Sequence, residues 1–337
     1  MSARIWRNAA PALILLLGVL AGTPLGAQQP SSVNPTASSV KEDQLLNQLR
    51  QVDGRVSIPD GRAGVLIQPA GQGWRSFHQV TLQWVGGLSI LGVVALICAF
   101  YAKRGRIRVA AGPSGQRLTR FNGFERFTHW LTAGTFVVLA VSGLNITFGK
   151  RLLLPLVGPD AFAAFSQFGK YAHNYLSFPF VLGLVLMLLI WIKDNVPGSN
   201  DVAWFKAGGG LLGKEHPPAG RFNGGQKLVF WIVMLGGAGM AVSGYVLLFP
   251  FVGTVVADMQ LANIVHGVIG VLFVAAMLGH IYIGSVGMEG AFDAMGTGEV
   301  DLNWAKEHHA LWAAEELRKT PSAGTTGAGK ASPNAAE

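Results

Sequence analysis

The sequence is poor in charged residues. Only 13% of its 337 residues are Asp, Glu, Lys or Arg, whereas 50% are hydrophobic. A typical soluble domain is about 25% charged. This deficit, concentrated in long apolar runs, indicates an integral membrane protein. The formal net charge of +8 is explained by basic loops beside membrane spans, so no nucleic-acid partner is expected.

Cysteine is almost absent. The single cysteine, Cys98, lies within an apolar run. One cysteine excludes a disulfide framework within the chain, and also a cysteine-ligated iron–sulfur cluster or zinc site. Any redox centre must therefore use histidine or other ligands, and Cys98 is most simply a small apolar residue of a span.

The N-terminal region has the pattern of a secretory signal followed by a polar segment. Residues 1–27 combine basic residues, a short apolar stretch and small residues of the kind found at a cleavage site, which predicts a signal peptide. The alternative is a first membrane span that is not cleaved. Residues 28–78 are polar and are expected outside the cytoplasm, where Arg55–Pro69 alternates enough to form a small hairpin.

Five apolar segments follow, each long enough to cross a hydrocarbon core of ~30 Å. They are Val80–Tyr101, His129–Phe148, Asn174–Ile192, Leu228–Phe249 and Leu261–Ser285. The predicted fold is an all-α membrane bundle, with an extra span at 79–102, a four-helix core at 120–290 and a tail at 291–337. In this tail we expect an amphipathic helix over Trp304–Lys319.

Basic residues set the predicted orientation. Seven Lys or Arg residues lie at 103–126, between the first and second spans, whereas the loop Pro250–Gln260 has none. Because cytoplasmic loops carry an excess of Lys and Arg, the N-terminus is expected in the periplasm and the C-terminus in the cytoplasm of a bacterial inner membrane.

Four histidines lie in or beside the apolar segments: His129, His173, His266 and His280. An ionisable side chain inside a membrane span is costly and by default marks a functional site. The predicted topology places His129 and His280 near the cytoplasmic face. It places His173 and His266 near the outer face. Two imidazoles at each depth can fill both axial positions of a haem iron, which predicts two haem b groups and electron transfer across the membrane.

The spacing within the fifth span is the sharpest part of this pattern. His266 and His280 are 14 residues apart, which on a helix is ~21 Å of rise and a difference in direction of only ~40°. One helix thus offers one imidazole to each of two stacked sites. Glycines in the spans, such as Gly143, Gly244 and Gly267, leave room for flat rings, although small residues also serve ordinary helix packing.

The four histidines have two other interpretations. A proton relay or a metal transporter would normally bring Asp or Glu into the spans, and the centres of these spans contain none. A haem-free membrane anchor, with the histidines as ordinary interfacial residues, is the remaining alternative. His78, His216, His308 and His309 are expected to be surface or interface residues rather than ligands.

The stretch Arg120–Trp130, the stretch Arg221–Lys227 and the tail Trp304–His309 together resemble the gamma subunit of respiratory formate dehydrogenase, a membrane dihaem cytochrome b. The resemblance runs from Arg120 to about Leu317. It implies that the four histidines are the haem ligands, paired His173/His266 at the outer haem and His129/His280 at the inner haem. The cytochrome b subunits of nickel–iron hydrogenases and thiosulfate reductases share the general helix pattern and remain an alternative.

The resemblance also implies a quinone site and partner subunits. Asn223, Gly225 and Gln226 would bind a menaquinone or ubiquinone beside His280, and Lys227 could stabilise a reduced anion; the same residues could simply form the first turn of a helix. The implied partners are an iron–sulfur beta subunit and a catalytic alpha subunit with molybdenum or tungsten, besides membrane lipid. This chain itself would transfer electrons and not oxidise formate.

Overall fold

The computed structural model describes residues 69–210, 217–250 and 252–319. The predicted signal peptide of residues 1–27 lies outside the described residues, as does the predicted hairpin apart from its last residue, Pro69.

The described part of the chain is helical apart from two short strands and the connecting loops. In chain order its elements are α3 (Pro69–Ser76), the π-helical turn η1 (Phe77–Thr81), α4 (Leu82–Arg104), β1 (Arg117–Thr119), α5 (Gly123–Leu152), α6 (Leu154–Val157), α7 (Pro159–Trp191), η2 (Lys193–Asn195), α8 (Ser199–Lys206), η3 (Gly208–Gly210), α9 (Gly224–Leu248), α10 (Val256–Tyr282), η4 (Ile283–Gly287), α11 (Asp293–Gly296), β2 (Glu299–Asp301), α12 (Leu302–His308) and α13 (Ala310–Lys319).

Five helical stretches are long and apolar enough to cross a membrane. They cover Gly73–Arg104, Gly123–Leu152, Pro159–Trp191, Gly224–Leu248 and Val256–Gly287. The predicted all-α membrane bundle with five spans is therefore confirmed, and the protein is a multi-pass membrane protein. In a bilayer this is one of two ways in which a chain can satisfy all its backbone hydrogen bonds without water.

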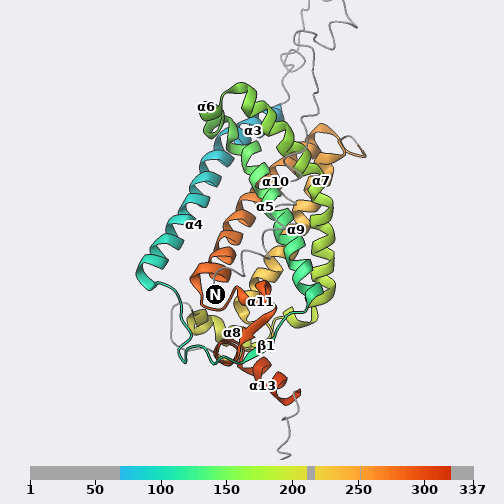
Figure 1. Cartoon of the computed structure of the whole chain (residues 1–337). Helices are drawn as coiled ribbons and strands as arrows, with labels where there is room; N and C mark the ends of the chain where they lie inside the picture. The colour runs from blue at the N-terminus through green and yellow to red at the C-terminus, as the bar shows by residue number, and fades with distance from the viewer. Residues whose placement is uncertain (1–68, 211–216, 251, 320–337) are drawn as a thin grey trace, which may run out of the picture. The chain divides into compact units, whose positions relative to one another are not determined.

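The bundle is built from two helical hairpins. Helix α5 packs along α7, and α9 packs along α10, with fewer contacts between the hairpins than within each one. Figure 1 shows α4 outside these four helices, beside α10. A Cβ atom on Gly86 of α4 would lie only 2.9 Å from a methyl group of Val271 on α10, so glycine permits this close approach.

The helices extend beyond the apolar segments from which they were predicted. The third helix begins at Pro159 and not at Asn174, so His173 lies in the interior of α7 and not at its start. Hydropathy marks the part of a helix that crosses hydrocarbon, whereas hydrogen bonding continues into the interface, and Pro159 at the first turn is a favourable start.

The predicted helix Trp304–Lys319 is wrong as a single element. It is two helices, α12 and α13, separated at His309, which has a non-helical backbone (φ −144°, ψ 50°). The NH of Leu311 donates to the carbonyl of Ala219 (3.1 Å), and this long-range contact breaks the helix. Strand β2, which precedes α12, pairs antiparallel with β1. Figure 1 shows α8, α11, β1 and α13 at the same end of the bundle, and we call β1, β2, α11, α12 and α13 the cap.

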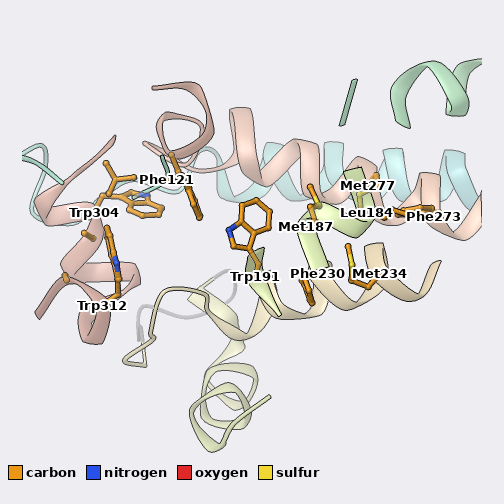
Figure 2. Close-up of a cluster of buried hydrophobic side chains, with 14 of the residues drawn as sticks. Phe121, Leu184, Met187, Trp191, Phe230, Met234, Phe273, Met277, Trp304 and Trp312 are labelled. Atoms are coloured by element: carbon orange, nitrogen blue, oxygen red, sulfur yellow. The ribbon is translucent and has the colours of Figure 1, made fainter. Parts of the chain in front are cut away.

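One cluster of buried apolar side chains connects the cap with the interior of the bundle. Figure 2 shows Trp304, Trp312 and Phe121 at the cap, then Trp191, then methionines, phenylalanines and Leu184 from α7, α9 and α10. The 299–319 segment is therefore packed as part of the core and is not a loose tail.

Candidate functional site

The outer pair of histidines is joined across the two hairpins. His173 of α7 and His266 of α10 face one another with ring centroids 6.1 Å apart and ring planes inclined by 64°. The two residues are far apart in the sequence, and only the packing of the hairpins brings them together.

The second pair lies closer to the cap. His129 of α5 and His280 of α10 have ring centroids 6.3 Å apart and planes inclined by 60°. His129 lies near the start of α5, and His280 lies near the end of α10. The structure thus brings the four histidines together in the pairs predicted from their depth in the membrane.

Both separations fit a single metal ion held between two imidazoles. A bond from an imidazole nitrogen to a metal is about 2.0–2.1 Å long, and a ring radius of about 1.1 Å on each side gives a centroid separation of about 6.3 Å. Among the described residues no group of three or more His, Cys, Asp or Glu side chains gathers as a metal site. A bare metal ion usually needs more protein ligands, whereas a haem iron needs two axial ones.

Two serines hold the rings of the outer pair. Ser142 Oγ on α5 lies 2.8 Å from Nδ1 of His173, and Ser243 Oγ on α9 lies 3.0 Å from Nδ1 of His266. The glycine after each serine lets the ring pack closely against the helix. A Cβ atom on Gly143 would lie 3.5 Å from Cε1 of His173, and one on Gly244 would lie 3.2 Å from Cε1 of His266. By contrast, a Cβ on Gly267 would meet Leu82 of α4, so that glycine serves helix packing.

The serines reveal an internal repeat that the sequence analysis missed. The segment Arg-Phe-Asn-Gly occurs at 120–123 and again at 221–224, and the segment Ala-Val-Ser-Gly occurs at 140–143 and again at 241–244. In both cases the second copy follows 101 residues later. A comparison of the sequence with itself would have found this signal. Each copy begins a helical hairpin, α5–α7 or α9–α10, and each hairpin carries one histidine of the outer pair.

The first segments of the repeat interlock at the cap end of the bundle. Arg120 Nη2 donates to the carbonyl of Arg221 (2.6 Å), and Arg221 Nη2 donates to the carbonyl of Arg120 (3.2 Å). Arg120 also lies 3.4 Å from Gln226 Oε1, and Arg221 lies 2.6 Å from Glu125 Oε1. Glu125 and Gln226 occupy the same position of the repeat, so the contacts are related by a local two-fold. We call these four residues the arginine clasp.

The two arginines differ in their charge balance. Arg221 pairs with Glu125 and also with Asp194 (3.0 Å). No ion pair of Arg120 is found in the described part of the chain; its guanidinium lies over the rings of Phe121, Trp304 and Trp312 at 5.2, 5.3 and 5.0 Å. Burial and the nearby charge of Arg221 lower the pKa of Arg120 to about 9.

The histidines of the tail do not lie at the surface, which corrects the prediction for His308 and His309. Both are buried, and His309 is 0% exposed. Nδ1 of His309 lies 2.9 Å from the carbonyl of Gly220, and Nε2 lies 3.1 Å from Arg120 Nη2. Burial and the charge of Arg120 hold the pKa of His309 well below its usual value, so the ring is neutral, with its proton on Nδ1 and its Nε2 accepting from Arg120. His216 lies outside the described residues, and His78 is half-buried.

The residues implied as a quinone site form the first turn of α9. Asn223 is the N-cap: its Oδ1 accepts from the NH of Gln226 (3.0 Å), and Gln226 Oε1 accepts from the NH of Asn223 (3.2 Å). A Cβ atom on Gly225 would lie 2.5 Å from Trp204 of α8, and Lys227 forms an ion pair with Asp201 (2.9 Å). These residues therefore hold the start of α9 against α8. A cavity of about 260 Å³ adjoins them, lined by side chains that include Asp201, Trp204 and Lys227.

Comparison with known proteins identifies the core of the chain. The profile of the prokaryotic cytochrome b561 family matches residues 120–298. The chain is similar to the cytochrome b556(fdo) subunit of formate dehydrogenase from Escherichia coli (strain K12), with 28% identity over 207 residues, 60% of this chain and 94% of that protein. It is also similar to the cytochrome b556(Fdn) subunit of nitrate-inducible formate dehydrogenase from the same strain (27%; 58% of this chain and 89% of that protein). A third relative is the cytochrome b556 subunit of formate dehydrogenase from Haemophilus influenzae (25%; 60% and 84%).

Proposed function

The chain belongs to the prokaryotic cytochrome b561 family, and from this membership we propose that it is the membrane cytochrome b subunit of a formate dehydrogenase. Membership implies that it binds haem b. The observation that carries the proposal is the presence of two histidine pairs, with centroids 6.1 and 6.3 Å apart, at two depths of one bundle. The named relatives supply the link to formate.

In this proposal each histidine pair holds one haem b. His173 and His266 would hold the outer haem, and His129 and His280 would hold the inner haem. A haem iron with two imidazole ligands has no open position, so when bound it supplies one-electron transfer and no oxygen chemistry. The protein supplies the ligands, their orientation and an apolar bundle that keeps water away from both sites.

The proposed direction of electron flow is inward. Outside the cytoplasm, a molybdenum or tungsten alpha subunit oxidises formate to carbon dioxide, one proton and two electrons, and an iron–sulfur beta subunit delivers the electrons to the outer site. On the cytoplasmic side, a quinone takes up two electrons and two protons to become a quinol. Charge thus crosses the bacterial inner membrane, with the N-terminus periplasmic and the C-terminus cytoplasmic.

We place the quinone near the cap, at Asn223, Gly225 and Gln226. The helix cap uses the oxygen atoms of both amide side chains, so their amide NH2 groups are the donors that would bind a quinone carbonyl. The internal repeat offers a matched control, because Asn122 caps α5 in the same way and pairs with Glu125.

The experiment on the whole proposal is a visible difference spectrum of the complex, purified in mild detergent from its native membrane. Formate is added first and dithionite second. We expect two b haems per chain, both reduced by formate. Reduction by dithionite alone would favour another donor, such as a hydrogenase or thiosulfate reductase partner. The absence of any haem signal would overturn the proposal and leave a haem-free anchor or transporter.

The quinone site is tested with the matched asparagines. Asn223→Ala and Asn122→Ala should each destabilise the protein by about 1 kcal/mol through the lost cap. Only Asn223→Ala, and likewise Gln226→Ala, should slow quinone reduction while both haems are retained. Equal rates of quinone reduction in the two asparagine variants would show that Asn223 only caps the helix and does not bind quinone.

A further inference from the structure

The two serines of the repeat act on the outer histidines in the same direction. Ser142 Oγ donates to the carbonyl of Val138 (2.7 Å), and Ser243 Oγ donates to the carbonyl of Gly239 (2.6 Å). A hydroxyl has one hydrogen, and these backbone bonds use it. Each imidazole also forms a hydrogen bond with a backbone carbonyl, that of Leu139 for His173 and that of Met240 for His266. A carbonyl can only accept, so both histidines carry their proton on Nδ1, each serine Oγ accepts from the same ring, and Nε2 is the free nitrogen.

In the inner pair, at least one histidine lacks a hydrogen bond of this kind at Nδ1. Nδ1 of His129 is buried and has no hydrogen-bond partner within the described ranges. At the outer site both imidazoles donate a hydrogen bond to a buried oxygen. The two sites thus differ in the hydrogen bonding of their ligands, although their ring separations are nearly equal.

We propose that Ser142 and Ser243 are positioning residues that make the outer haem the lower-potential haem of the two. This inference rests on the proposed dihaem function. A hydrogen bond from Nδ1–H to an acceptor makes the ligating nitrogen more basic and fixes the ring. A more basic ligand stabilises the oxidised, ferric iron more than the reduced iron, which lowers the reduction potential. Electrons that enter at the outer site then move inward to a site of higher potential.

The test is a redox titration of the purified complex, followed by the haem absorption bands. The variants are Ser142→Ala and Ser243→Ala, with Ser142→Thr and Ser243→Thr as conservative replacements that keep a hydroxyl. The matched control is Ser89→Ala on α4, because Ser89 Oγ makes the same type of bond, to the carbonyl of Val85 (2.7 Å), far along the chain from the histidines. The variant His266→Ala should remove the outer haem, so the redox transition that disappears in this variant is that of the outer haem.

The expected result is an upward shift of the outer midpoint in each alanine variant, with the inner midpoint unchanged. The threonine variants and Ser89→Ala should keep the wild-type midpoints. Unchanged midpoints in both alanine variants, a downward shift, or a shift confined to the inner haem would overturn the inference.

Loss of a haem, from a variant or from the wild-type complex, also has a defined meaning. If an alanine variant loses the outer haem, the two midpoint potentials of the wild-type complex are compared instead. The haem that is missing from His266→Ala must then have the lower of the two midpoints. The reverse order would overturn the inference. A wild-type complex with fewer than two haems would instead overturn the proposed function itself, so the two failures are distinguishable.

Discussion

At the scale of single residues, His309 holds a neutral imidazole against a buried cation. Its Nε2 is 3.1 Å from Arg120 Nη2, and its Nδ1–H donates to the carbonyl of Gly220. Protonation of this ring would place two positive charges in direct contact in a buried site. A neutral His309 therefore adds to the other contacts that hold the tail on the bundle, and its protonation would weaken them.

Acidification should weaken the cap. The pKa of His309 is well below its ordinary value, so below about pH 6.5 the unfolded segment binds a proton that the folded segment does not. Stability from this residue is complete above about pH 6.5 and falls by up to about 1.4 kcal/mol per pH unit as the pH decreases. Hydrogen exchange of residues 302–319 at pH 7.5 and pH 5.5, corrected for intrinsic rates, measures the effect.

The control for this prediction is His309→Gln, which keeps a neutral acceptor and donor at the same position. This variant should show little dependence of protection on pH. Equal protection of the wild-type segment at both pH values would contradict the assigned role of His309.

At the scale of secondary-structure elements, the arginine clasp joins the starts of α5 and α9. Glu125 is 5% exposed and accepts from Arg221 (2.6 Å) and from Trp191 Nε1 (2.9 Å). Loss of this side chain would leave the buried indole NH of Trp191 without its acceptor.

Glu125→Ala should therefore destabilise the protein by roughly 1–3 kcal/mol, because it removes the buried acceptor of Trp191 Nε1, while Arg221 keeps its ion pair with the exposed Asp194. Thermal unfolding in detergent, followed by circular dichroism, measures the change. The comparison is Glu315→Ala, which removes an exposed pair with Lys319 (2.7 Å) and should leave the unfolding temperature unchanged. Similar unfolding temperatures of the two variants would show that the arginine clasp contributes little to the stability of the protein.

The contact of α4 with α10 offers a second test at this scale. Gly86→Leu would drive a side chain into Val271, where even a Cβ atom lies 2.9 Å from a methyl group. We expect overpacking of about 1–3 kcal/mol, relieved by separation of α4 from the bundle. Cysteine cross-linking between α4 and α10 should then fail while haem content stays at the wild-type level. Loss of haem in this variant would mean that α4 is part of the haem-binding core.

At the scale of the whole molecule, the four-helix core is a duplicated hairpin with unequal halves. The repeat places matching serines beside the outer histidines, and matching arginines in the clasp. The inner pair breaks the symmetry: 101 residues after His129 lies Phe230, a buried residue of the apolar cluster. One copy thus supplies His129, and the other supplies His280.

The proposed orientation leads to a topology prediction. Because the basic segments at 103–126, 193–210 and 217–227 and the cap lie at one end of the bundle, a reporter fused after Glu337 should report the cytoplasm. A fluorescent protein should be active there, and alkaline phosphatase, which needs the periplasm, should be inactive. An active phosphatase at this end would reverse the proposed direction of electron flow.

The sequence by itself determined the class of protein, the five spans and the spacing of the two histidines on α10. These properties are local: hydropathy is summed over adjacent residues, and the 14-residue spacing of His266 and His280 follows from the geometry of one helix. Even so, the starts of α7 and α10 were predicted too late in the chain, at Asn174 and Leu261 instead of Pro159 and Val256, because a helix can begin before its hydrophobic stretch does.

Only the tertiary structure decided the contacts between distant residues. The hydrogen bonds of Ser142 and Ser243 to the outer histidines depend on how the helices of each hairpin pack, and the burial of His309 depends on a contact with Arg120, which lies 189 residues earlier. No local pattern encodes these distances, because each arises when separate elements bury their apolar faces together. The break between α12 and α13 has the same origin, since a bond to the 219 loop outweighs the helical preference of the tail.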